Sequence, residues 1–120
     1  MRKVKVKICG LKRAQDIECV NKLLPDYIGF VFAKTKREVT EQQAAQLKAM
    51  LNPQIKAVGV FVNAEIDLIV RLAASRTIDI IQLHGEEDAA YCERLRLQTE
   101  LPIIKAVRVK DAGSFENLQA

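Results

Sequence analysis

Apolar residues, many of them β-branched, gather in five short runs along the chain, at residues 4–8, 27–32, 57–62, 79–84 and 103–109. Runs of this length that are rich in valine and isoleucine predict β-strands. Their centres lie roughly 20 to 30 residues apart, which is the length of one strand followed by one helix. The spacing therefore predicts five strand–helix units in succession.

The segments between these runs carry apolar residues three or four positions apart, which is helical spacing. We expect four helices, with buried stripes of Ile17, Val20 and Leu24 in the first, Ala44, Leu47 and Leu51 in the second, Ile66, Ile69, Val70 and Ala73 in the third, and Tyr91 and Leu95 in the fourth. Each helix is therefore expected to pack on the strands along one side.

Polar residues predict where three of these helices begin. Thr40 followed by Gln43 matches a capping box at the start of the second helix. Asn63 is expected to cap the third helix. The fourth helix is expected over residues 86–97, with the acidic residues 86–88 in its first turn, where the helix dipole favours negative charge.

Strands that alternate with helices predict a parallel sheet. Two architectures fit five such units. A flavodoxin-like doubly wound sheet is complete at about this length. A (β/α)₈ barrel of the TIM type needs eight units and typically about 250 residues, so the chain would supply its first five. In either case we expect residues 1–120 to form a single domain, which for the barrel is partial and ends in a fifth helix opened by residues 111–120.

Composition excludes several classes of partner. Hydrophobic residues make up 49% of the chain and charged residues 28%, as in a globular domain. The apolar runs are far shorter than the roughly 18 residues that span a bilayer, and no leader is recognised, so we expect a cytoplasmic protein without membrane contact. The net charge of +4 is spread along the chain. That distribution suits a small anionic substrate rather than a nucleic acid.

Polar side chains stand at the carboxyl ends of the predicted strands, on the side opposite the apolar stripe. They are Lys7 and Cys9 in the first strand, Gln82 and His84 in the fourth and Lys105 in the fifth. In a barrel these faces converge, so the polar groups would meet in one pocket. A flavodoxin-like receiver module would instead carry acidic residues after its first strand, and no phosphate-binding glycine loop follows any strand.

Six segments in chain order resemble the strand-end motifs of phosphoribosylanthranilate isomerases. They are KVKICGL at residues 5–11, GFVF at 29–32, KREV at 36–39, VGVFVN at 58–63, QLHGE at 82–86 and IKA at 104–106. The resemblance covers nearly the whole chain and implies a (β/α)₈ barrel. It also implies an Amadori rearrangement of N-(5-phosphoribosyl)anthranilate to a 1-deoxyribulose 5-phosphate in tryptophan biosynthesis, with no metal or organic cofactor.

This resemblance assigns roles to residues of the chain. Cys9 matches the family's general base, and Lys7 on the same strand face would help to lower the pKa of its thiol. Arg37 matches the arginine that holds the anthranilate carboxylate. His84 lines the pocket, and Lys7 and Gln82 are expected to face the substrate. The other two cysteines, Cys19 and Cys92, fall on helices and are expected to serve packing.

Two features of the family find no match in these 120 residues. The general acid is an aspartate at the end of the sixth strand, and the phosphate is held by glycine-rich loops after the seventh and eighth strands. A five-stranded sheet would also leave two open edges, so the chain is expected either to self-associate through those edges or to reclose into a flavodoxin-like sheet. The alternative to the enzyme is a non-catalytic binding module of flavodoxin-like or receiver type, for which substitution of Cys9 would change no activity.

We therefore expect the 120-residue chain by itself to have little or no isomerase activity, because loss of one partner of an acid–base pair costs about 10²- to 10⁴-fold. A fluorescence assay of substrate consumption measures this. Turnover within about tenfold of that of a full-length homologue, abolished by Cys9→Ser, would contradict the expectation.

Overall fold

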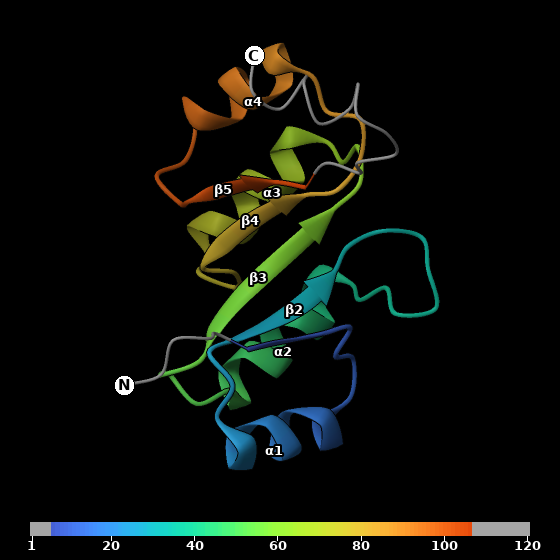
Figure 1. Cartoon of the computed structure of the whole chain (residues 1–120), viewed down its shortest axis with the longest axis vertical. Coiled ribbons are helices and arrows are strands. Elements are labelled where there is room, and N and C mark those ends of the chain that lie inside the picture. The colour runs from blue at the N-terminus through green and yellow to red at the C-terminus, as the bar shows by residue number, and fades with distance from the viewer. Residues whose placement is uncertain (1–5, 107–120) are drawn as a thin grey trace, which may run out of the picture.

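Five strands pair in parallel to form one sheet in the computed structural model, which describes residues 6–106. The strands are β1 Lys7–Cys9, β2 Tyr27–Val31, β3 Lys56–Phe61, β4 Ile80–Leu83 and β5 Ile103–Lys105. Four helices connect them: α1 Ala14–Leu23, α2 Glu41–Met50, α3 Ile66–Ala74 and α4 Ala89–Arg96. The structure thus confirms the alternation of strands and helices that the sequence predicts (Figure 1).

The strand order in the sheet is β1-β2-β3-β4-β5, the same as the order in the chain. A flavodoxin-like sheet has the order 2-1-3-4-5, because its chain reverses direction across the sheet after the first unit. The structure therefore contradicts the flavodoxin-like alternative. Every connection runs the same way, so all strand carboxyl ends lie at one edge of the sheet.

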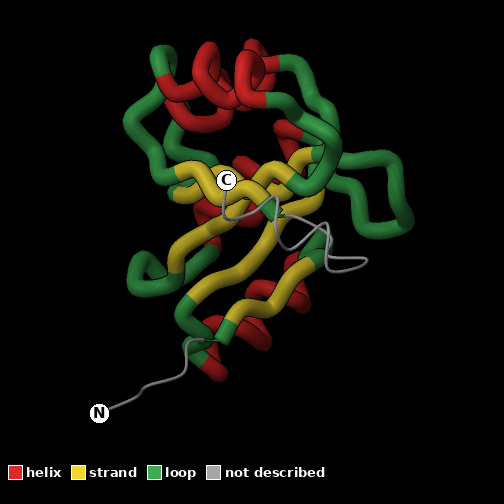
Figure 2. Tube along the Cα trace, turned by 45° about the horizontal axis from the view of Figure 1, so that its top comes forward, coloured by secondary structure: helices red, strands yellow, loops and turns green. Residues whose placement is uncertain are grey.

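All four helices cover the same face of the sheet. Their buried side chains belong to one cluster with outward-facing strand residues, and its members include Ile17, Leu47, Ile69 and Leu95 from the helices and Ile28, Phe30, Phe61, Ile81 and Leu83 from the strands. Burial of each such side chain contributes about 1.5–3 kcal/mol. In the views of Figures 1 and 2, the helices lie behind the strands or beyond the edge strands β1 and β5. They leave the opposite face of the strands uncovered.

The sheet is curved, with the helix-free face on the concave side. Lys7 Nζ in β1 donates a hydrogen bond to Gln82 Oε1 in β4 at 2.7 Å. The two strands are three spacings apart, which in a flat sheet is roughly 14 Å. Side chains that stand upright on a flat sheet do not meet across that gap. Strand twist and curvature bring β1 and β4 toward each other above β2 and β3.

The predicted cap of α2 is present in full. Thr40 Oγ1 accepts a hydrogen bond from Gln43 N–H at 3.0 Å, and Gln43 Oε1 accepts one from Thr40 N–H at 2.9 Å. Ala44, Leu47 and Leu51 are buried as the helical spacing predicts.

The predicted starts of α3 and α4 are wrong. Asn63 adopts a left-handed conformation with φ of 50° and does not cap α3, whose N-cap is Glu65. Helix α4 begins at Ala89 after Asp88, whose side chain accepts from Tyr91 N–H at 2.8 Å. Residues 86 and 87 therefore precede the helix and are free for other contacts.

Smaller differences lie at the edges of the fold. Strand β1 begins at Lys7, and Val6, expected on the apolar face, is 46% exposed. Leu24 ends α1 with φ of 51° and is also exposed. Cys19 is exposed, which contradicts its expected packing role, whereas Cys92 packs partly buried against the core. The fifth helix and the last residues of the fifth predicted strand lie outside the described residues.

No helix within residues 6–106 has the length and apolar character to cross a bilayer.

We expect Thr40→Ala to lower the free energy of unfolding by about 1 kcal/mol, because it removes the oxygen that accepts from the α2 N-terminus. Thr40→Ser keeps this oxygen and is expected to stay close to the parent chain. Urea denaturation of the three chains measures the difference. Equal midpoints for the alanine and serine variants would show that the cap contributes nothing.

Candidate active site

Cys9 ends β1 on the concave side of the sheet, where its thiol is exposed. Its neighbour in β2 is Gly29, and a Cβ atom at that position would lie 2.6 Å from Cys9 Sγ. Any larger residue would displace the sulfur. The absence of a side chain at Gly29 therefore provides the space that the thiol occupies.

Arg37 lies directly over the turn that follows Cys9. Gly10 has φ of 88°, and a Cβ atom there would come within 2.5 Å of Arg37 Cδ. Glycine is thus required twice at this position, once for the left-handed backbone and once for the close approach of the arginine stem. The structure brings Cys9 and Arg37 together, although 28 positions separate them in the chain.

The loop after β2 that carries Arg37 is tied back onto the sheet. Val39 N–H donates to Val31 O at 2.9 Å, and Glu38 forms a parallel bridge with Val31. Lys12 Nζ reaches from the loop after β1 to the carbonyl of Lys36 at 2.9 Å. These contacts hold the two loops side by side and fix the base of the arginine side chain.

Lys7 and Gln82 share the concave face, as the sequence predicts. The hydrogen bond between them joins β1 to β4 on that face. Lys7 stands two residues before Cys9 on the same side of β1, so its ammonium group adds positive charge to the concave face.

His84 follows β4 at the same edge of the sheet, and its side chain is exposed. Its backbone N–H donates to Phe61 O of β3 at 2.8 Å. The imidazole is therefore carried by a strand end that is tied to its neighbour.

The expected inward position of Lys105 is wrong. Lys105 pairs in register with Leu83, a fully buried residue of the helix-facing core, and so lies on the outer face of the sheet. Its ammonium donates to Glu87 Oε1 at 2.6 Å and to Gly85 O at 2.5 Å. The lysine thus supports the loop after β4 from outside the concave face.

Glu87 is the residue of this region that the sequence reasoning missed. Its side chain is 0% exposed and accepts hydrogen bonds from Asn63 N–H at 2.7 Å and from Gly85 N–H at 3.0 Å, in addition to the Lys105 ion pair. Burial alone raises the pKa of Glu87, but the hydrogen bonds from Lys105 and from the backbone outweigh burial and leave the pKa lowered. The carboxylate is charged at neutral pH.

Tyr91 in α4 lies close to the Glu87 carboxylate. Burial, followed by the nearby Glu87 carboxylate, raises the pKa of Tyr91 to about 12. Its hydroxyl donates to Ala64 O at 2.6 Å. The loop after β3 is therefore fixed to α4 as well as to Glu87.

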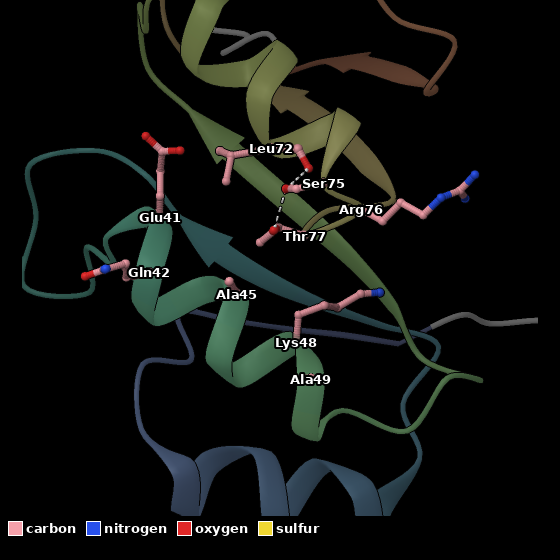
Figure 3. A pocket seen from close by; sticks show the side chains of 9 residues that line it. All are labelled: Glu41, Gln42, Ala45, Lys48, Ala49, Leu72, Ser75, Arg76 and Thr77. Atoms are coloured by element: carbon pink, nitrogen blue, oxygen red, sulfur yellow. Dashed lines mark hydrogen bonds between the residues drawn. The ribbon is translucent and has the colours of Figure 1, made fainter.

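A cavity of about 460 Å³ lies elsewhere in the described part of the chain. It opens between α2 and α3 on the helical face, where Figure 3 shows its lining by Glu41, Gln42, Ala45, Lys48, Ala49, Leu72, Ser75, Arg76 and Thr77. Two hydroxyl groups of its lining, Ser75 Oγ and Thr77 Oγ1, lie within hydrogen-bond distance of each other at 2.9 Å. This cavity is separated by the sheet from Cys9 and His84. Residues 6–106 contain no group of three or more potential metal ligands among His, Cys, Asp and Glu.

A curved parallel sheet with helices on one face and polar groups at the strand carboxyl ends defines an α/β protein with a strand-end site. Within that class, the family model for N-(5'-phosphoribosyl)anthranilate (PRA) isomerase matches residues 6–120, and the chain therefore belongs to this family.

Known relatives agree with this assignment. The isomerase of Endomicrobium trichonymphae is 51% identical over 107 residues, which are 89% of this chain and 54% of the relative. A crystal structure of monomers of the dimeric Thermotoga maritima isomerase matches with a TM-score of 0.84 and 35% identity, over 95% of this chain and 58% of that one.

A third relative is a phosphoribosylanthranilate isomerase in complex with reduced 1-(o-carboxyphenylamino)-1-deoxyribulose 5-phosphate. It matches with a TM-score of 0.83 and 34% identity, and the match covers 96% of this chain and 59% of that chain. The chain spans about half the length of the curated relatives that it matches.

We expect the stabilising effect of Glu87 to depend on pH. The pKa of Glu87 in the folded chain lies below its usual value of 4.5, so the carboxylate stabilises the fold above that pH, and the contribution is lost as the pH falls through the lowered pKa. Glu87→Gln is expected to cost about 1–3 kcal/mol at pH 7, and the difference from the parent shrinks below pH 4.5.

Urea denaturation of both chains between pH 3 and pH 7 gives this difference directly. Asp16 and Glu41 also have lowered pKa values, but their contributions to the free energy of unfolding are the same in both chains and cancel in the difference. Glu86→Gln, at an exposed neighbouring carboxylate, is the matched control. A Glu87→Gln difference that stays constant across this range would contradict the ion pair.

Proposed function

We propose that the protein is a phosphoribosylanthranilate isomerase of tryptophan biosynthesis and that these 120 residues supply the first five strand–helix units of its (β/α)₈ barrel. The observation that carries the proposal is the close approach of the Arg37 stem to Gly10, the residue after Cys9, at the carboxyl edge of a curved parallel sheet. Chain-order strand pairing and a concave inner face are what a barrel requires of its first five strands.

Cys9 is proposed to act as the general base of the Amadori rearrangement. An acid first protonates the ribose ring oxygen, and the ring opens as the nitrogen lone pair forms a C1′=N bond, which leaves an iminium ion at C1′. The Cys9 thiolate then removes the proton from C2′. The electron pair of that C–H bond forms the C1′=C2′ double bond, and the C1′=N π pair returns to the nitrogen, which gives a neutral enolamine. Tautomerisation of this enolamine gives the ketone product. The thiolate is the form of cysteine that accepts a proton.

Arg37 is proposed to bind the anthranilate carboxylate of the substrate. A guanidinium group presents paired N–H donors that match the two oxygens of a carboxylate. The arginine stem is held against Gly10, next to the residue that would take the proton. Binding of the carboxylate there would fix the anthranilate ring relative to Cys9 and orient the C2′–H bond.

His84, Lys7 and Gln82 are proposed to line the same pocket. The exposed imidazole of His84 forms one wall at the end of β4. Lys7 and Gln82, joined by their hydrogen bond on the concave face, supply the polar groups at the base of the pocket. The positive groups Lys7 and Arg37 suit a substrate that carries a carboxylate and a phosphate.

The general acid and the phosphate-binding loops are proposed to come from segments that no residue of this chain matches. The reaction consists of proton transfers within one molecule, so the proposal includes no metal or organic cofactor. A cytoplasmic location is part of the same proposal. Self-association through the edge strands stays a prediction.

We expect a chimera to carry isomerase activity that depends on Cys9. In this chimera the chain replaces the matching segment of the Thermotoga maritima relative. Cys9→Ser is expected to lower kcat/KM by about 10²- to 10⁴-fold, because a hydroxyl is a far weaker base than a thiolate. Loss of the fluorescent substrate is the measurement.

Cys19→Ser is the matched control, since Cys19 is also exposed but lies on α1 among the helices. This variant is expected to keep the parent activity within about twofold. An active chimera in which Cys9→Ser has no larger effect than Cys19→Ser would rule out Cys9 as the base.

A further inference from the structure

The backbone on both sides of the His84 Cα atom is held by groups outside β4. The His84 N–H donates to Phe61 O at 2.8 Å, which fixes the peptide unit before the Cα atom. The Gly85 N–H donates to Glu87 Oε1 at 3.0 Å, which fixes the peptide unit after it. These two units define the φ and ψ angles of His84, so Glu87 controls one of the two.

The side chain of His84 is exposed, and no residue between 6 and 106 gives it comparable support. An exposed imidazole on a fixed backbone moves only about its own χ1 and χ2 angles. The region of space open to the ring is therefore set by the backbone, and thus by the contacts of Gly85.

Glu87 joins three strand-end segments at this point. Besides Gly85 after β4, it accepts from Asn63 N–H after β3 and from the Lys105 ammonium in β5. A Cβ atom at Gly85 would lie 2.9 Å from Asn63 N, which shows how closely the two loops approach. A shift of the carboxylate would move all three segments together.

Stability alone does not require a carboxylate here. Replacement of a buried ion pair by apolar side chains of similar size is often neutral or stabilising. An apolar side chain, however, has no acceptor for the N–H groups of Asn63 and Gly85, which lie on adjacent loops. The distinctive effect of the carboxylate is to hold these two loops at a fixed separation.

We propose that Glu87 is a positioning residue that sets the place of the His84 imidazole in the candidate site. Its relevance to catalysis rests on the proposed function, in which His84 lines the substrate pocket. Glu87 touches no substrate in this proposal and acts through the loop backbone alone. Lys105 supports it by holding the carboxylate and the Gly85 carbonyl from the outer face of the sheet.

Nuclear magnetic resonance of the full 120-residue chain tests the positioning directly. His84 is the one histidine of the sequence, so its ring signals need no assignment. We expect Glu87→Gln to shift and broaden these signals, because the loop gains freedom when the ion pair is lost. Glu86→Gln, one position away and exposed, is expected to leave them unchanged.

Ring signals that stay unchanged in Glu87→Gln while the Gly85 amide signal moves would overturn the proposal. If Glu87→Gln does not fold, Lys105→Gln is judged by the same criterion, since it removes the ammonium but leaves the two backbone donors of Glu87 in place. Movement of the His84 ring signals in that variant supports the proposal, and their constancy overturns it.

Kinetics of the chimera test whether the effect passes through His84. Glu87→Gln is expected to lower kcat/KM by roughly tenfold or more, since small displacements of site groups are costly. In a His84→Ala background the same substitution is expected to change kcat/KM by less than about twofold. Equal losses in both backgrounds would overturn the coupling. An inactive chimera would count against the proposed function, while the ring signals would still decide the positioning of His84.

Discussion

Each strand of the sheet pairs with the strand before it in the chain, and the rest of the structure follows from this pairing order. Parallel strands joined by helices in strict succession place every helix on one face. The other face is left to curve inward, and all the strand carboxyl ends meet along one rim. Cys9 and His84 lie far apart in sequence but share that rim because of the pairing order and not because of any direct bond between them.

Local signals in the sequence predict most of the elements. Alternating runs locate the strands, and Thr40 with Gln43 locates the start of α2, because each signal depends on residues a few positions apart. The starts of α3 and α4 are not predictable in this way, because they depend on residues far apart in the chain. Asn63 and Glu87 bond to each other's loops across 24 positions, and this long-range contact takes both residues away from the helix termini that their types favour.

The candidate site was predictable in its residue types but not in its geometry. Motifs identify Cys9, Arg37 and His84, yet nothing local says that the arginine stem crosses Gly10 or that Gly29 makes room for the sulfur. These are close approaches between segments that are distant in the chain, and they are possible because glycine has no side chain. The face on which Lys105 lies cannot be predicted locally, because its strand is short and apolar on both sides and its buried partner Glu87 is 18 positions away.

The ion pair between Lys105 and Glu87 also selects among the ways in which the last described strand could pair. Strand β5 is only three residues long, Ile103–Lys105, and a slip of one position would exchange its two faces. The slipped strand would bury Ile104 instead, so hydrophobicity discriminates little between the two registers. A slip would, however, move the ammonium group to the concave face and leave the Glu87 carboxylate buried without its counter-charge. The free-energy cost of burying the Glu87 carboxylate without a counter-charge disfavours the slipped register. Any further strand that pairs with β5 would therefore pair with it in the observed register.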